Sequence, residues 1–263
     1  MLLIAIILGI IEGVTEFLPI SSTGHLILVG DLLGFQGPAG KTFEVVVQLG
    51  AILSVCWLFR QKIGSTAVGV LKMRPLDLRF ALGLLLAFMP AMVMGALFHK
   101  AIKETLFNPH TVSIALIVGG VAILAIERMK FTPRYTNLDN LPLPLCLKIG
   151  LCQCLALIPG TSRSGATILG ALLLGVDRKT AAEFSFFLAI PTMVAATAFQ
   201  VISEWDELSL DGIQLVAAGF VVAFLSALLV VRWFVNYVER HGFAPFAWYR
   251  IVLGTVMLVL LAK

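Results

Sequence analysis

The side chains of this sequence that could do chemistry gather in one short stretch, residues 12–25, which reads EGVTEFLPISSTGH. Glu12 and Glu16 stand four residues apart, so on a helix they share one face with their Cβ atoms about 5–6 Å apart. In an apolar environment two carboxylates that close repel each other unless one is protonated or a cation lies between them. The spacing therefore predicts acid–base chemistry or a metal ion held by Glu12 and Glu16.

Three hydroxyl groups and a histidine follow the acidic pair. Pro19 ends the first helix, and Ser21, Ser22 and Thr23 lie at the start of the next one. A helix start presents free backbone N–H groups and the positive end of the helix dipole, and both favour an anion. His25 adds a further acid–base group or metal ligand beside that anion site.

A second stretch, PGTSRSGAT at residues 159–167, has the same design with an arginine added. Ser162, Ser164 and Thr167 can donate hydrogen bonds, and the planar guanidinium of Arg163 can bind a phosphate through two parallel hydrogen bonds. Together the two stretches predict a cradle for a polyanion. Because ionisable groups inside a membrane are costly and usually functional, we expect the charged side chains of both stretches to act in a site.

Other polar residues lie near the ends of apolar segments. We assign Glu44 and Gln48 to substrate binding, whereas Glu183 fits the ordinary role of an acid near a helix start. Arg250 lies inside the last apolar segment, a few residues from its end. We expect its side chain to extend along the helix and to place its charge at the membrane surface.

The elements that must position these residues are membrane helices. Hydrophobic residues make up 59% of the 263 residues, and only 13% are charged, whereas a soluble domain has about 25% charged residues. The net charge of +4 is modest, and we assign it to loops that orient the protein in the bilayer and not to a nucleic-acid surface.

Six segments approach the roughly 20 apolar residues that span a bilayer. They are residues 43–59, 80–98, 111–126, 180–202, 213–235 and 243–261.

Two further apolar regions, residues 2–35 and 145–176, are each interrupted by one of the polar stretches. Their halves, about 10–15 residues long, suit re-entrant hairpins better than full spans. Non-helical backbone at membrane depth survives only where it is buried in protein or lines a wet cavity. Both breaks are therefore predicted to line a cavity.

The two broken regions resemble each other at one offset of 141 residues. This offset pairs Gly9 with Gly150, Glu12 with Gln153, Gly24 with Gly165 and Gly34 with Gly175. Each broken region is followed by three spans, so the two copies must have opposite orientations, as in the inverted-topology repeats of transporters. The prediction is an all-α polytopic membrane protein with six transmembrane helices and two re-entrant helical hairpins, forming one domain over residues 1–263 with repeats at about 1–128 and 145–263.

Loop charges predict the orientation. Segments 60–79 and 127–148 are rich in Lys and Arg, whereas segment 203–211 has four acidic residues and no basic one. The positive-inside rule places the first two segments in the cytoplasm and the third outside. The first hairpin then enters from outside, the second enters from the cytoplasm, and their tips can meet in a site that faces outside.

Four motifs carry a resemblance to a known family: EGVTEFLPISSTGH, KTFEVVVQLGAI, PGTSRSGATI and EFSFFLAIP. Over essentially the whole chain the sequence resembles the undecaprenyl-diphosphate phosphatases of bacterial inner membranes, also called the bacitracin-resistance family. The resemblance implies removal of one phosphate from a C55 polyprenyl diphosphate, which regenerates the lipid carrier of cell-wall synthesis. It also implies a divalent cation, Mg²⁺ or Ca²⁺, and a catalytic set that consists of Glu12, Glu16, Ser22, His25 and Arg163.

Two mechanisms and a second class of function stay open at this point. Ser22 can be a nucleophile with His25 or Glu16 as its base, or it can only bind phosphate while a metal-activated water attacks. Inverted repeats with charged tips at the midplane are also typical of transporters, so a polyprenyl-phosphate flippase or an anion transporter is the alternative. A homodimer is equally open.

Overall fold

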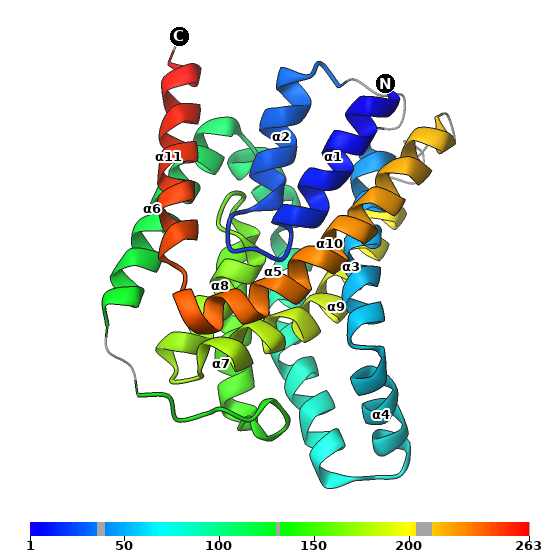
Figure 1. Cartoon of the computed structure of the whole chain (residues 1–263), viewed down its shortest axis with the longest axis vertical. Helices are drawn as coiled ribbons and strands as arrows, with labels where there is room; N and C mark the ends of the chain where they lie inside the picture. Colours follow the sequence, from blue (N-terminus) through cyan, green and yellow to red (C-terminus); the bar gives the residue numbers. More distant parts are fainter. Residues whose placement is uncertain (36–39, 130–131, 204–211, 263) are drawn as a thin grey trace.

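The computed structural model describes residues 1–35, 40–129, 132–203 and 212–262 (Figure 1). Within these ranges the backbone is helical apart from short links, and its β-structure is limited to one isolated bridge between Tyr135 and Val176. The prediction of an all-α protein is confirmed.

Six helices lie in the described part of the first half of the chain. They are α1 (Leu2–Thr15), α2 (Ser22–Leu32), α3 (Gly40–Leu58), α4 (Arg60–Leu71), α5 (Pro75–Leu106) and α6 (Pro109–Arg128). A 3-10 turn at Leu138–Asn140, η1, leads into the second half. Its elements are α7 (Leu143–Gln153), the 3-10 turn η2 (Cys154–Leu157), α8 (Arg163–Leu173), α9 (Arg178–Ser203), α10 (Ile213–His241) and α11 (Ala244–Leu261).

Five of these helices, α5, α6, α9, α10 and α11, are long and apolar enough to cross a membrane. The remaining predicted span, residues 43–59, corresponds to α3. This helix passes the same criterion only together with α4, from which it is bent by 73°. The described part of the chain therefore holds five or six candidate spans, as a multi-pass membrane protein requires.

The segment predicted as a basic loop, residues 60–79, is largely helical. It holds all of α4, and α5 begins at Pro75, where proline suits the first turn of a helix. Two of its charged side chains have partners: Arg60 lies over the ring of Trp57, and Lys62 forms an ion pair with Asp139 in η1. Similarly, α5 continues through most of residues 99–110, which lie between the predicted spans 80–98 and 111–126. Hydropathy marks only the apolar middle of a helix, not its ends.

The two broken regions match in the helix that follows each break, whereas the helix before the break is longer in the first region, α1, than in the second, α7. The offset of 141 residues carries both ends of α2 onto both ends of α8. It also pairs the left-handed residues before these helices, Ser21 with φ 69° and Ser162 with φ 75°. Such a conformation strains a residue with a side chain, so its recurrence shows that the chain enters α2 and α8 in the same way.

Each half-helix before a break packs closely on a long helix of the other half: α1 lies on α10, and α7 lies on α5. A Cβ atom on Gly9 would come within 2.6 Å of the Gly219 carbonyl oxygen, and one on Gly150 within 2.3 Å of the Ala87 carbonyl oxygen. Gly9 and Gly150 are partners in the sequence repeat. Their missing side chains let backbone meet backbone, as small residues do between membrane helices.

The two breaks lie inside the helical bundle, whereas both chain termini lie at one end of the molecule (Figure 1). The largest buried cluster surrounds Phe17 of the first break, whose ring meets that of Phe186 in α9 edge to face at 5.5 Å. The exposed faces of α5, α6, α10 and α11 carry Leu and Val side chains, as expected for helices that contact lipid.

Candidate active site

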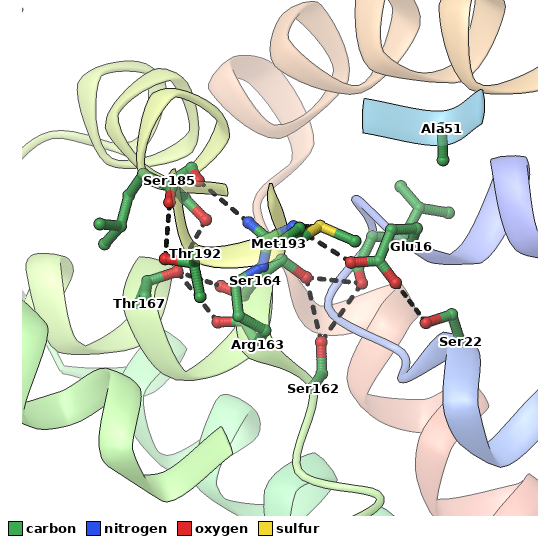
Figure 2. Close-up of polar contacts among 12 residues, drawn as sticks. Glu16, Ser22, Ala51, Ser162, Arg163, Ser164, Thr167, Ser185, Thr192 and Met193 are labelled. Atoms are coloured by element: carbon green, nitrogen blue, oxygen red, sulfur yellow. Dashed lines mark hydrogen bonds and ion pairs between the residues drawn. The ribbon is translucent and has the colours of Figure 1, made fainter. Parts of the chain in front are cut away.

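The carboxylate of Glu16 joins the two breaks (Figure 2). Its Oε1 accepts a hydrogen bond from Nη2 of Arg163 at 3.1 Å, and its Oε2 accepts a hydrogen bond from the hydroxyl of Ser22. Only 8% of the Glu16 side chain and 12% of the Arg163 side chain are exposed. The predicted nucleophile, acidic residue and phosphate-binding arginine therefore form one buried group.

The hydroxyl of Ser22 bonds to Glu16 and not to His25. The two ring nitrogens of His25 are engaged elsewhere: Nδ1 lies 2.7 Å from the carbonyl oxygen of Ser21, and Nε2 lies 2.6 Å from the hydroxyl of Tyr249. Of the two bases that the sequence left open for Ser22, the geometry favours Glu16. His25 instead connects the helix start at Ser21 to α11.

Arg163 is held in place but keeps one free donor. Its Nη1 donates to the carbonyl oxygen of Ser185 at 3.0 Å, its Nη2 also approaches the sulfur of Met193 at 3.3 Å, and the guanidinium lies over the ring of Phe17. Its buried Nε has no hydrogen-bond partner among the described residues. An unpaired buried N–H is costly, so this donor suits a phosphate oxygen.

The hydroxyls of the second break hold the two tips together. Ser164 donates to the carbonyl oxygen of Leu18 in the first break at 2.8 Å, and Ser162 lies 3.0 Å from Ser164 (Figure 2). Ser162 also caps α8 by accepting from the backbone N–H of Gly165 at 3.1 Å. Thr167 bonds to the hydroxyl of Ser185 at 2.7 Å. These residues lie around Arg163 as predicted, although each already has a partner within the protein.

Glu12 is fully buried, and neither of its carboxylate oxygens has a hydrogen-bond partner among the described residues. It interacts electrostatically with Glu16, Glu44 and Arg163. A carboxylate in this position requires a proton or a cation. The described residues hold no group of three or more metal-ligating side chains. Mg²⁺ can be held by one or two carboxylates and take its other ligands from phosphate oxygens and water, and the Glu12 and Glu16 pair is compatible with such a cation.

The remaining predicted substrate residues differ in exposure. Ser21 is buried at its left-handed turn, and Thr23 is half-buried in the first turn of α2. On α3, Gln48 is half-buried and Glu44 is exposed. Glu44 therefore lies at the rim of the acidic group.

Comparison with known proteins identifies the family of this chain. The family model of the bacitracin resistance protein BacA matches residues 5–256. The chain belongs to the BacA family. It is 56% identical to Undecaprenyl-diphosphatase 2 of Paramagnetospirillum magneticum over 257 residues, which cover 98% of each protein. It is 54% identical to Undecaprenyl-diphosphatase of Parvibaculum lavamentivorans over 258 residues, covering 97% of this chain and 95% of that one. The family resemblance seen in the sequence is confirmed.

In this BacA-family chain the sequence prediction for Arg250 is wrong. The side chain does not reach a membrane surface, because it is 1% exposed and donates to backbone carbonyl groups from three parts of the fold. These are Pro19, Gly160, Thr161, Ala115 and Leu116, at 2.8–3.3 Å. The breaks leave carbonyl groups without helical partners, and a guanidinium with five N–H donors can satisfy several of them at once.

The role of Tyr249 was also missed by sequence reasoning. Its hydroxyl bonds to His25, which is 224 residues away along the chain. The only local signal is that a tyrosine directly precedes a charged residue inside an apolar span. That signal does not identify His25 as the partner of Tyr249.

Replacing Arg250→Met should destabilise the folded protein strongly. It leaves several buried carbonyl groups unpaired, and hydrogen bonds to charged groups contribute about 1.5–3 kcal/mol each. We expect a clearly lower thermal unfolding midpoint in detergent. Arg232→Met, which changes an exposed arginine on α10, is the matched control and should have little effect. Equal midpoints for the two variants would contradict the role assigned to Arg250.

Proposed function

We propose that this chain hydrolyses undecaprenyl diphosphate to undecaprenyl phosphate and inorganic phosphate, which recycles the lipid carrier of cell-wall synthesis. One observation carries the proposal: Glu16 accepts hydrogen bonds from both Ser22 and Arg163 where the two breaks of a multi-pass membrane protein meet. Relatives that are at least half identical over nearly their full length bear the name of this activity.

The geometry favours the serine route over direct attack by water. Ser22 already donates its hydroxyl proton to Glu16, as an activated nucleophile does toward its base. Its oxygen attacks the terminal phosphorus, its proton passes to Glu16, and the bond between this phosphorus and the bridging oxygen breaks, releasing undecaprenyl phosphate. Water then breaks the phosphoserine bond, which releases inorganic phosphate and restores the hydroxyl, with Glu16 transferring the proton.

In this proposal Arg163 and a divalent cation stabilise the negative charge on the phosphate. Arg163 lies beside Glu16 with a free Nε donor, so it can bind a phosphate oxygen as charge builds up. Glu12 and Glu16 would hold Mg²⁺ or Ca²⁺, which when bound offsets the negative charge of the diphosphate. The unpartnered oxygens of Glu12 support this assignment.

We further propose the finer membrane arrangement: six spans and two re-entrant hairpins in one domain, as an inverted-topology repeat. The matching bounds of α2 and α8 and the crossed packing of α1 on α10 and α7 on α5 support it. In this arrangement the α4–α5 turn faces the cytoplasm of the bacterial inner membrane and the site faces outside, which the basic charge of segments 60–79 and 127–148 supports. The acidic segment 203–211 is predicted to lie outside the cell, and its residues 204–211 lie outside the described residues.

Ser22→Ala separates the two chemical routes. If Ser22 is the nucleophile, phosphate release from undecaprenyl diphosphate by purified protein should fall by several orders of magnitude. If water attacks directly, the loss should be that of one hydrogen bond to a charged group, about 10- to 150-fold. Ser54→Ala, which removes a buried hydroxyl that bonds within α3, should stay close to wild type. A wild-type protein that releases no phosphate would instead favour the transporter alternative.

Glu12→Gln should weaken the response to divalent cations, because it removes one of the two proposed carboxylate ligands. We expect the activity curve against Mg²⁺ or Ca²⁺ to shift to about tenfold higher concentration, a change of about 1.4 kcal/mol. Glu104→Gln, at an exposed side chain in α5, is the matched control. An unchanged titration curve for Glu12→Gln would remove this residue from the proposed cation site.

Cysteine labelling tests the orientation. In a protein whose four native cysteines are replaced, Glu104→Cys should react with a membrane-impermeant thiol reagent in intact cells. Ser65→Cys, which is exposed on α4, should react only after the membrane is permeabilised, because the basic segments face the cytoplasm. The opposite pattern would invert the arrangement and move the site to the cytoplasmic side.

A further inference from the structure

An apolar hollow of about 400 Å³ lies between the first break and the corner where α10 passes into α11. Leu18 and Ile20 of the break form one wall. Four aromatic side chains face them: Trp233 and Tyr237 near the end of α10, and Phe246 and Tyr249 at the start of α11. Val14, Thr15 and Pro245 complete the lining. The lining is mainly apolar, so it suits a hydrophobic chain.

The hollow and the candidate active site share the first break as a common wall. Leu18 lines the hollow, and its carbonyl oxygen accepts the hydroxyl of Ser164 on the side of Arg163. Tyr249 also lines the hollow, and its hydroxyl lies 2.6 Å from Nε2 of His25. A ligand that reaches both places needs an anionic end for the active site and a long apolar remainder.

A second hollow of about 290 Å³ provides a comparison. It lies between η2 and the last turns of α5, and its lining includes Met94, Phe98 and Leu157. No side chain in its lining bonds to the Glu16–Ser22–Arg163 group or to His25 in the described structure. The second hollow also borders a break, through Leu157 and Ile158. Among the described residues, the first hollow differs in that its Tyr249 bonds to His25, a predicted site residue.

We propose that the hollow at the α10–α11 corner binds the isoprene units of the substrate nearest to the diphosphate. This inference rests on the proposed function. Isoprene units are flat and carry methyl branches, so they can stack on the rings of Trp233 and Tyr249, which are half-exposed. The phenol of Tyr249 marks the polar end of the hollow beside His25. Occupancy of the hollow would favour diphosphates that carry a long prenyl chain over short ones.

Trp233→Ala tests this subsite. Trp233 is 50% exposed, and its ring packs on that of Tyr237 at 4.6 Å. Its loss should remove chain contacts without disturbing the buried site. We expect kcat/KM for undecaprenyl diphosphate to fall about tenfold, mainly through KM, which corresponds to about 1.4 kcal/mol. Hydrolysis of dimethylallyl diphosphate, which has one isoprene unit, should not change. Phe98→Ala, at a 47% exposed aromatic residue of the second hollow, should change neither rate.

Two results of this experiment would overturn the subsite. An equal loss with both substrates would mean that Trp233 supports the site as a whole. No loss with either would mean that ordinary membrane lipid fills the hollow. If the wild-type protein hydrolyses neither diphosphate, the proposed function itself fails. This outcome is distinguishable from the two results above, because in those the wild-type protein is active.

A photoreactive substrate analogue gives a readout that does not depend on turnover. A prenyl diphosphate with a diazirine on its second isoprene unit should label residues between 233 and 249, and an excess of undecaprenyl diphosphate should abolish the labelling. Labelling confined to residues 94–106 would place the chain in the second hollow and overturn the inference. Labelling at 233–249 that persists in excess substrate would overturn it as well.

Discussion

The structure depends on satisfying backbone carbonyl groups where two helices break inside the bundle. Water is scarce at that depth, so each unpaired carbonyl group is costly. Arg250 meets this requirement for both breaks at once, because its guanidinium donates to Pro19 in the first and to Gly160 and Thr161 in the second. A single side chain thereby fixes the tips against each other and against α6.

The chemistry of the site follows from the same constraint. Once the tips are held together, buried charges that would be strongly destabilising alone are paired. Glu16 lies between the hydroxyl of Ser22 and the guanidinium of Arg163. Two unsatisfied groups remain close by, the carboxylate of Glu12 and the Nε of Arg163. One requires positive charge and the other a negative one, and a diphosphate with its cation would supply both.

The repeat explains how one backbone turn came to serve two tasks. The offset of 141 residues pairs Ser22 with Arg163 at the first position of α2 and α8, and it pairs Glu12 with Gln153. The first copy thus carries Glu12, Glu16 and Ser22, and the second carries Arg163. Gln153 is as buried as Glu12, but it accepts a hydrogen bond from Thr192 and has no charge to balance. Equivalent turns that meet tip to tip can bring complementary chemistry together.

The sequence by itself determined the membrane class, the two breaks, their repeat offset and the reactive residue types, because these depend on local composition and spacing. The ends of helices such as α4 and α5 could not be predicted from the sequence, since charged residues continue a helix as readily as they form a loop. Only the tertiary structure decided that Glu16 and not His25 accepts the Ser22 hydroxyl, that Tyr249 bonds to His25, and that Arg250 is buried. Each of these contacts joins groups that are brought together by packing, which no local pattern encodes. Arg250 shows the limit most clearly: its surroundings along the chain are those of a snorkelling arginine, and its true partners lie 89 to 231 residues away.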